Sequence, residues 1–444
     1  MGKRTFLKFL AWLGITPFVR PEGQKVAVNK ELRNWAGNLR YSVDKVFRST
    51  SLPEVRKFVS QHPRLRALGT RHCFNRIADS SDELISLRSM DRPLQCNAEK
   101  RTVTVEAGIS YGQLSPWLTA QGFALHNLAS LPHISVAGAC ATGTHGSGVT
   151  SGNLSTAVAA MEIVTANGEI LELSRETHAD VFPGAVVHLG ALGVVTKLTL
   201  DVEPKYEARQ YVYQHMPMSQ AYEHFDAIMS SGYSVSFFTG WQEMEEVWIK
   251  LRDKSDFTPK PEFFGAKLAK KDLHPLAELS AENCTRQVGV PGPWYERLPH
   301  FRMGFTPSTG DELHAEYFVP RRNAVEAVQA MARMSDEIRP HLLISELRTV
   351  AADKLWMSPC YDQASLAIHF TWKPDWKSVR RLLPRIEREL SPFGARPHWG
   401  KLFTLEPAVL QSRYPRLPDF KRLVAKHDPR GKFRNEFLST NLYG

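Results

Sequence analysis

Residues 67–87, ALGTRHCFNRIADSSDELISL, place a histidine in a short turn that begins at a glycine. The histidine is His72, the turn begins at Gly69, and Phe74 and Asn75 follow it. Such a histidine can pack against its neighbours, ligate a metal, act as a base or bind a cofactor. The stretch by itself leaves these four alternatives open.

A second stretch, SLPHISVAGACATGTHGSGVTSG at residues 130–152, is rich in glycine and in hydroxyl side chains. Glycine exposes its backbone N–H without a Cβ in the way, so such a strip can cradle a pyrophosphate. Two familiar phosphate motifs are excluded, because no GxGxxG lies between a strand and a helix and no lysine follows Gly143. A surface loop is the plain alternative. Two turns that each carry a histidine, His72 and His145, favour one extended cofactor instead.

The sequence between these turns and around them shows a mixed α and β pattern up to about residue 202. Residues 51–61 predict a helix that starts with a capping box of Ser51 and Glu54. Residues 161–174 predict a hairpin whose Asn167-Gly168 pair favours a type I′ turn. Further elements are expected as strands over 64–68 and 102–108, a helix over 110–122, and a strand after the turn at 189–193.

The second half changes character and predicts long, mostly antiparallel strands with two amphipathic helices. One helix is expected over 323–338 and the other over 375–390, with Asp375 as its N-cap. A chain of 444 residues is too long for one ordinary core and favours two domains.

The composition excludes several classes of protein. Hydrophobic residues make up 43% and charged residues 23%, which argues against disorder. The net charge of +10 favours anionic ligands, but no basic block indicates nucleic acid. Five cysteines without a CxxC pair indicate free thiols, and neither HExxH nor another metal-ligand pattern occurs, so no metal is expected. No apolar run is long enough to span a membrane.

The first residues leave the location of the protein open. Residues 3–8, KRTFLK, look like a twin-arginine export signal with lysine in place of the first arginine. No small-x-small cleavage site follows, and Pro17 and Arg20 end the apolar run early. We therefore favour an amphipathic extension over residues 1–31 and a cytoplasmic protein, with export as the alternative.

Taken together, the two turns make the sequence recognisable. It resembles the flavin-dependent oxidases of the vanillyl-alcohol oxidase superfamily and is most similar to the alditol (xylitol) oxidases, a branch related to the sugar-lactone oxidases. The resemblance implies an α+β fold with a PCMH-type FAD-binding domain over 32–204 and a substrate domain with a large antiparallel sheet over 205–444. Its last segment, about 415–444, would return to the flavin. Beyond the two turns, the motifs that carry the resemblance are NWAGN (34–38), LGALGVVTKLTLDVEP (189–204), VPGPWYERLPHFR (290–302), SELRTVAAD (345–353), AIHFTW (367–372), RPHWGKLF (396–403) and DPRGKFRNEFL (428–438).

The resemblance answers the question that His72 raises. In this family the histidine of the G-x-x-H-S-F-N turn bonds covalently to the 8α-methyl of FAD, and Cys73 stands where the family usually has serine. A covalent link keeps the cofactor bound and raises its redox potential. The other residues that the resemblance implies for FAD binding are Ala67, Leu68, Gly69, Thr70, Arg71 and Cys73 in the first turn, Ser130, Ser135, Gly138, Thr142, Gly143, Thr144 and His145 in the second, and Val195 at the adenine end.

Three segments of the second half carry polar side chains at strand spacing. Glu346 and Arg348 are two residues apart and share one face. In residues 365–372, SLAIHFTW, His369 and Thr371 share the polar face, opposite a fully apolar one. For each strand taken alone, the polar side chains are explained by a face that is exposed to solvent. Within the family, however, the resemblance implies a substrate cavity whose substrate-binding residues are Ser130, Glu346, Arg348, Thr371 and Lys401.

The chemistry suggests a role for each catalytic candidate. An alcohol must lose a hydride to flavin N5 while its hydroxyl loses a proton, and nearby positive charge stabilises both. Arg348 and Lys401 would supply that charge, and Glu346 would bind hydroxyls and hold Arg348. His369 is the leading base. Lys401 is its rival if burial and Arg348 lower its pKa.

The resemblance implies oxidation of an alditol such as xylitol or sorbitol at its terminal carbon to the aldose, with O2 as acceptor and hydrogen peroxide as product. The alternative within the class is a sugar-1,4-lactone oxidase or dehydrogenase. A binding protein that has lost catalysis is a different class, and retention of the catalytic candidates disfavours it. The expected partners are the small-molecule substrate and O2, without nucleic acid, and the protein is expected to be a monomer.

Overall fold

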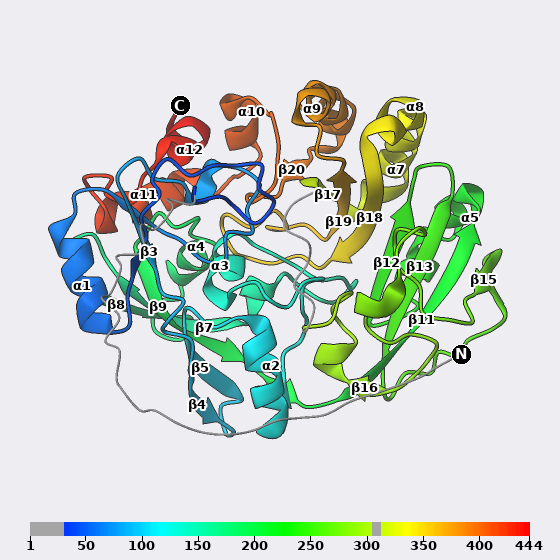
Figure 1. Ribbon diagram of the computed structural model, residues 1–444, viewed down its shortest axis with the longest axis horizontal. Helices are drawn as coiled ribbons and strands as arrows, with labels where there is room; N and C mark the ends of the chain where they lie inside the picture. The colour runs from blue at the N-terminus through cyan, green and yellow to red at the C-terminus, as the bar shows by residue number, and fades with distance from the viewer. Residues whose placement is uncertain (1–30, 304–311) are drawn as a thin grey trace, which may run out of the picture. The chain divides into compact units, whose positions relative to one another are not determined.

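Residues 31–303 and 312–444 are described by the computed structural model. The N-terminal segment, with its alternatives of an extension and an export signal, lies outside them. Among the described helices, none is both long and apolar enough to cross a membrane. Residues 31–444 build a mixed α and β fold around two main sheets, which lie at the lower left and at the right of Figure 1.

The smaller main sheet is antiparallel throughout and has the order β4-β5-β9-β7-β8. Its period-two pattern is realised in β5, where Val103 and Val105 are buried in the core. The five strands span Pro93–Asn97 (β4), Thr102–Glu106 (β5), Val158–Val164 (β7), Ile170–Ser174 (β8) and Val194–Asp201 (β9).

The hairpin predicted around Asn167 and Gly168 is confirmed, but its predicted turn type is wrong. Residues 165–169, instead of two residues, join β7 to β8. Gly168 has a φ of +81°, whereas Asn167 is outside the left-handed region that a type I′ turn requires at both positions. The longer loop lets the carbonyl of Gly168 accept a 2.8 Å hydrogen bond from Arg56 Nε, which ties the loop to the first helix.

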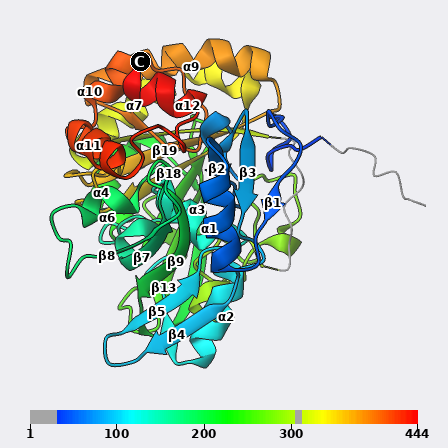
Figure 2. The same cartoon turned by 90° about the vertical axis from the view of Figure 1, so that its left-hand side faces the viewer.

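That first helix, α1 (Leu52–Gln61), confirms the prediction over residues 51–61 and lies beside a small parallel sheet, as Figure 2 shows. The capping box is wrong, because the Ser51 side chain makes no capping bond and Glu54 instead accepts the N–H of Thr50 at 2.8 Å. The remaining elements of this half are β1 (Phe47–Arg48), β2 (Leu65–Ala67), β3 (Glu83–Ser86), β6 (Phe123–Ala124), β10 (Glu203–Pro204), α2 (Tyr111–Ala120), α3 (Val136–Ala141) and α4 (Phe182–Val186).

The larger sheet has ten strands within the described residues, in the order β14-β15-β11-β13-β12-β18-β19-β17-β20 with β16 beside β11. Its neighbouring strands are antiparallel, as the sequence predicted. Strands of the smaller main sheet precede residue 204 and these follow it, although a domain boundary there stays a prediction. The ten strands are β11 (Glu207–Met216), β12 (Ser234–Thr239), β13 (Met244–Arg252), β14 (Glu262–Phe263), β15 (Ala266–Leu268), β16 (Gly292–Pro293), β17 (Leu313–Pro320), β18 (Leu342–Val350), β19 (Ser365–Trp372) and β20 (Arg396–Pro397).

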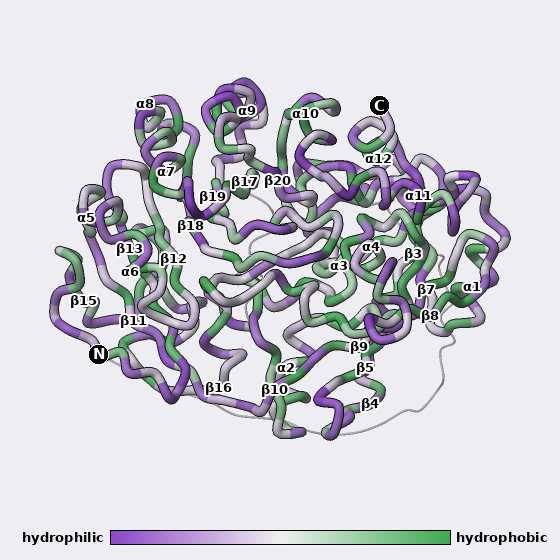
Figure 3. The backbone as a smooth tube through the Cα atoms, turned by 180° about the vertical axis from the view of Figure 1, so that it is seen from behind, coloured by the Kyte–Doolittle hydropathy of each residue, from purple (hydrophilic) through white to green (hydrophobic). Residues whose placement is uncertain are grey.

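One face of this sheet is apolar and is covered by helices. Leu366, Ile368, Phe370 and Trp372 of β19 are fully buried in the core with residues of α7 and α9, which confirms the predicted apolar face. Hydrophilic segments recur along α8 and α9 in Figure 3, where these helices meet solvent. The helices on this side are α5 (Met218–Glu223), α6 (Phe225–Met229), α7 (Ala324–Arg333), α8 (Ser335–Ile338) and α9 (Trp376–Leu390).

The opposite face of the sheet is polar where β17, β19 and β18 run side by side. Glu316, His369 and Glu346 are direct neighbours across these three strands. His314 and Thr371 are neighbours one step along. The register therefore places charged side chains from strands far apart in sequence on one wall.

The C-terminal segment packs against the strand that leads into the first turn. The Leu65 N–H bonds to the Lys432 carbonyl at 3.0 Å, and Arg66 Nη1 bonds to the Phe433 carbonyl at 2.8 Å. Asn435 Nδ2 bonds to the carbonyls of residues 76, 77 and 79, just beyond the turn. The helices of this segment are α10 (Pro407–Ser412), α11 (Leu417–His427) and α12 (Glu436–Leu438).

Candidate active site

A cavity of about 390 Å³ lies between the two turns and the polar face of the larger sheet. All the site residues predicted from sequence line it except Gly143. Gly143 has a φ of +66° and follows the C-cap of α3, so it shapes the turn after that helix. The predicted residues that the structure brings together are Ala67, Leu68, Gly69, Thr70, Arg71, His72, Cys73, Ser130, Ser135, Gly138, Thr142, Thr144, His145, Val195, Glu346, Arg348, His369, Thr371 and Lys401.

The two turns meet at Ser135. A Cβ on Gly69 would lie 2.8 Å from Ser135 Oγ, and a Cβ on Gly138 would lie 2.7 Å from the same atom. The Ser135 N–H also approaches Thr70 Oγ1 at 3.4 Å. Glycine at position 69 therefore lets the first turn approach the second, and glycine at position 138 leaves room for the Ser135 side chain between them.

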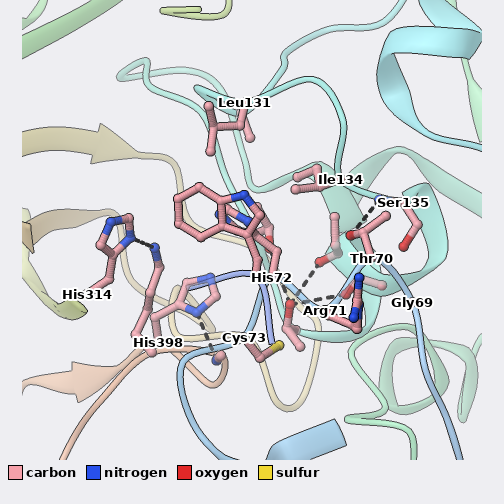
Figure 4. A pocket seen from close by; sticks show the side chains of 18 of the residues that line it. Gly69, Thr70, Arg71, His72, Cys73, Leu131, Ile134, Ser135, His314 and His398 are labelled. Carbon is pink, nitrogen blue, oxygen red and sulfur yellow. Dashed lines mark hydrogen bonds between the residues drawn. The ribbon is translucent and has the colours of Figure 1, made fainter. Parts of the chain in front are cut away.

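His72 lies between this meeting point and the sheet, as Figure 4 shows, with Ser135 on one side and His314 and His398 on the other. Its ring centroid is 4.5 Å from that of Trp35. Burial lowers the pKa of His72 well below its ordinary 6.5, and the charges of Lys401 and His314 lower it further. The imidazole is therefore neutral and retains a nucleophilic nitrogen at neutral pH.

The backbone of the first turn is held to the segment that carries Lys401. Asn75 Nδ2 donates to the carbonyls of Trp399 and Lys401 at 2.8 and 2.7 Å, and the Phe74 N–H bonds to the Gly400 carbonyl at 2.7 Å. The Phe-Asn pair after His72 thus has a structural function. It fixes the turn against the wall of the cavity that holds the lysine.

Cys73, the departure from the family's serine, lies against this same segment. A Cβ on Gly400 would be 3.2 Å from the Cys73 sulfur. Burial raises the pKa of the Cys73 thiol to about 11, against an opposing effect of Lys401. The side chain is therefore a neutral thiol at neutral pH.

A buried ion cluster occupies the polar wall. Arg348 Nη2 donates to Glu316 Oε1 at 2.7 Å, and Arg348 Nε lies 3.5 Å from Glu346 Oε2. Arg348 Nη1 also reaches Ser130 Oγ at 3.3 Å. Burial lowers the pKa of Arg348, but Glu346 and Glu316 outweigh it and the net shift is upward. The guanidinium is thus a permanent positive charge at the cavity.

Each carboxylate of the cluster has a histidine as its second partner. His300 Nε2 lies 2.7 Å from Glu346 Oε1, and His145 Nε2 lies 3.1 Å from Glu316 Oε1. Burial raises the pKa of Glu346, yet Arg348 and His300 together hold it far below its ordinary 4.5. Burial also raises the pKa of Glu316, and the charges of His145 and Arg348 outweigh it. Both groups are therefore ionised at neutral pH.

His369 stands between these two carboxylates on β19, with unused hydrogen-bonding capacity. Both of its ring nitrogens are buried and neither has a hydrogen-bond partner among the described residues. Burial lowers the pKa of His369 well below 6.5, and Lys401 lowers it further. A neutral ring in the cavity wall is available to accept a hydrogen bond or a proton from a ligand.

Lys401 lines the cavity from the segment that follows β20. Its Nζ lies 2.7 Å from Nδ1 of His314, whose Nε2 lies 2.8 Å from Glu312 Oε1. Burial lowers the pKa of Lys401 to about 8, with Glu316 opposing and Arg348 adding to this effect. A fraction of the amine is therefore neutral near neutral pH, so both candidate bases, His369 and Lys401, are present at the site.

Several residues that line the cavity were missed in the sequence. His314 and Glu316 alternate with buried Leu313, Ala315 and Tyr317 in β17, and this period-two signal is the one that identified His369. His300 lies in a loop, which has no periodicity to reveal it. The missed lining residues that carry polar or aromatic groups are Trp35, Arg66, Arg88, His188, Phe238, His274, His300, Phe301, Glu312, His314, Glu316 and His398.

Comparisons with known proteins agree on fold and chemistry. Residues 45–174 match the family model of an FAD binding domain, and residues 311–441 match that of D-arabinono-1,4-lactone oxidase. The chain is 45% identical to an alditol oxidase of Streptomyces sp., over 93% of this chain and 99% of that protein. It is 28% identical to the L-gulonolactone oxidase of Bos taurus, over 93% of this chain and 98% of that one.

A solved structure shares the fold at much lower sequence identity. Cholesterol oxidase from B. sterolicum superposes with a TM-score of 0.76 at 13% identity, and the match covers 93% of this chain and 96% of that one. This likeness concerns the fold alone.

Proposed function

Because the chain belongs to the family of the alditol oxidases, FAD-dependent oxidoreductases related to the sugar-lactone oxidases, we propose that it oxidises a polyol at a terminal CH–OH group. The PCMH-type fold with a large antiparallel sheet and the FAD cofactor that the sequence predicted are confirmed. The substrate, the covalent bond and the residue roles below belong to the proposal.

The residues of the cavity fit FAD. The two glycines that face Ser135 leave a narrow cradle of bare backbone in which side chains would clash. Residues 67–73, Ser135, Gly138 and Thr144 would hold the dinucleotide there, and Val195 would lie near its adenine end. His72, neutral and half-buried beside Trp35, would form the covalent bond.

Bound FAD would supply the acceptor for the hydride. The chain itself has to bind the substrate, hold charge and take one proton. Arg348 is a buried cation that stabilises negative charge as it develops, and the carboxylate of Glu346 accepts hydrogen bonds from substrate hydroxyls. Thr371 in β19 and Ser130 in the second turn add hydroxyl contacts. His369 or Lys401 takes the proton from the reacting hydroxyl.

The observation that carries the proposal is the unpartnered ring of His369 between two ionised carboxylates in a cavity wall. A buried polar group normally has a partner, so a ring without one indicates a hydrogen-bonding ligand. A substrate with a hydroxyl on each carbon satisfies such a wall. An apolar substrate would leave it desolvated at a large cost.

The test is anaerobic titration of the purified yellow protein with a substrate panel, followed by peroxide assay in air. Xylitol and sorbitol are expected to bleach the flavin and to yield hydrogen peroxide on readmission of O2. If no alditol bleaches the flavin, the proposal is wrong.

A sugar-1,4-lactone oxidase is the second candidate. The match of residues 311–441 to the D-arabinono-1,4-lactone oxidase model favours it, because this span holds the whole charged wall from Glu316 to Lys401. L-gulono-1,4-lactone and D-arabinono-1,4-lactone in the same panel decide between the two.

A further inference from the structure

A line of three titratable side chains runs along the cavity wall to a partly exposed carboxylate. Lys401 lies in the cavity wall, His314 is 6% exposed, and the side chain of Glu312 is 27% exposed. Lys401 Nζ lies 2.7 Å from His314 Nδ1, and His314 Nε2 lies 2.8 Å from Glu312 Oε1. Figure 4 draws the first of these contacts at His314. The line therefore joins Lys401 to a carboxylate that lies in the same cavity wall and is in contact with solvent.

The proposed oxidation releases a proton that has to leave this site, and the present inference rests on that proposed function. The substrate loses a hydride from carbon, which carries both electrons, and one proton from its hydroxyl. The contacts of Glu316 and Glu346 lead back into the buried cluster through Arg348, His145 and His300. The contacts of Lys401 lead instead, through His314, to the partly exposed carboxylate of Glu312.

We propose that Lys401, His314 and Glu312 form a proton relay that carries the hydroxyl proton of the substrate from the cavity to solvent. The substrate O–H bond breaks and an N–H bond forms at Lys401 Nζ, directly or after transfer through His369. Nζ then passes a proton to Nδ1 of His314, and Nε2 of the same ring passes its proton to Glu312, which releases it to water. No electrons move in these transfers.

The surroundings of His314 hold its ring in the orientation that the relay needs. The ring stacks on Phe74, with centroids 4.2 Å apart and an angle of 19° between the ring planes. The backbone carbonyl of His314 accepts the Leu402 N–H at 2.8 Å. The His369 ring is 4.7 Å away, centroid to centroid. The tautomer with its proton on Nε2 accepts from the lysine and donates to the carboxylate at the same time.

The electrostatics of the line support this direction of transfer. Burial lowers the pKa of Lys401 to about 8, so the amine can both accept and release a proton near neutral pH. Burial also lowers the pKa of His314. The charge of Lys401 lowers this pKa further, and the charge of Glu312 opposes the shift. The titratable and charged groups that face Lys401 and His314 are His72, Cys73, Glu312, Glu316, Arg348, His369 and His398.

The test is stopped-flow reduction of the flavin in the holoenzyme by xylitol, in H2O and in D2O. His314→Gln is expected to slow reduction by about tenfold or more and to raise the solvent isotope effect, because proton transfer becomes limiting. Added imidazole should restore the rate, which a purely structural role would not allow. Glu312→Gln should slow reduction less, and Glu312→Asp should recover it.

Glu243→Gln is the matched control. Glu243 also contacts a histidine ring, at 2.7 Å from His215 Nδ1, but this pair is exposed and not among the residues that line the cavity. Its reduction rate is expected to equal that of the wild type. A His314→Gln protein with full flavin content, a wild-type rate and an unchanged isotope effect would overturn the relay.

A second measurement does not depend on turnover. Nitrogen NMR of histidine-labelled holoenzyme, assigned with His314→Gln, is expected to show His314 protonated on Nε2, with a signal that shifts in Glu312→Gln. A His314 ring protonated on Nδ1 alone would overturn the relay. A His314 signal that does not shift in Glu312→Gln would overturn it as well. If no polyol reduces the flavin of the wild type, the proposed function is wrong, and NMR still tests whether His314 donates to Glu312. If a polyol reduces wild type and His314→Gln alike, only the relay fails.

Discussion

Arg348 donates a 2.7 Å hydrogen bond to Glu316 although strand β19 lies between their two strands. The contact passes over the strand that carries His369, so the arginine and the carboxylate hold the two sides of the candidate site together. One buried ion cluster thus links strands β17 and β18 across the strand between them.

Replacing Glu316 by glutamine should destabilise the fold. The change keeps the shape but removes the charge that compensates Arg348, and breaking a buried ion pair costs about 3–5 kcal/mol. Denaturant unfolding of the holoenzyme measures the free energy, with Glu337→Gln, at the exposed pair with Arg385, as the control. An unchanged free energy of unfolding would show that the pair contributes no net stability.

Replacing His72 by alanine should abolish the covalent bond to the flavin. Mass spectrometry of the denatured wild type is expected to show the chain plus one FAD, and that of His72→Ala the bare chain. Because the glycine cradle at Ser135 is untouched, the native variant should still bind FAD reversibly. A wild-type chain of unmodified mass would remove the covalent assignment and leave dissociable FAD in place.

Replacing Gly138 by alanine should lower the FAD content, since the new Cβ would lie 2.7 Å from Ser135 Oγ. Apart from its chain neighbours and the backbone of its own helix, no other atom of the described residues lies within 4 Å of the added carbon, so Ser135→Ala in the same chain should relieve the clash. The flavin-to-protein absorbance ratio of both single variants and the double variant gives the comparison. A double variant no better than Gly138→Ala would mean that the glycine is needed for another reason.

The pH dependence of flavin reduction should identify the base. If Lys401 accepts the proton, the rate rises as pH increases through about 8, because only the neutral amine is a base. If His369 accepts it, the rate is flat above pH 6.5, because burial and Lys401 hold its pKa well below that value. Lys401→Met should flatten the profile in the first case and leave its shape unchanged in the second.

Acid should destabilise the protein through its buried neutral histidines. Burial lowers the pKa of His300 to about 4, against an ordinary 6.5. The unfolded chain therefore binds a proton at pH values where the folded one does not, and stability falls as pH decreases from about 6.5 to 4. His300→Gln should make this decline shallower in denaturant titrations across that range. An identical slope in both proteins would assign the acid sensitivity to other groups.

Period-two alternation predicted correctly which side chains share the polar face of two strands. The faces of β18 and β19 follow from it, so the pairs Glu346–Arg348 and His369–Thr371 lie as expected. The same signal is present in β17 and would have shown Glu316. What the alternation does not contain is the order of strands, which places β19 between β17 and β18 and makes three separate patterns one wall.

The remaining features depend on contacts that the sequence does not encode locally. His300 approaches Glu346 from an irregular loop. The turn at Asn167 follows the anchoring of its loop to Arg56 instead of the preference of the dipeptide. Gly143 is glycine because the backbone after α3 has a positive φ, and it does not line the cavity. The glycine-rich sequence does not distinguish such a glycine from those that line the cavity.

The contacts of Lys432 and Phe433 with residues 65 and 66 join two parts of the chain that are far apart in sequence. Arg66 and Phe433 are 367 positions apart, yet a direct hydrogen bond links them. The strand that leads into the histidine turn therefore cannot be completed until residue 433 has been synthesised. A chain truncated before this segment would lack part of the support for the turn that carries His72.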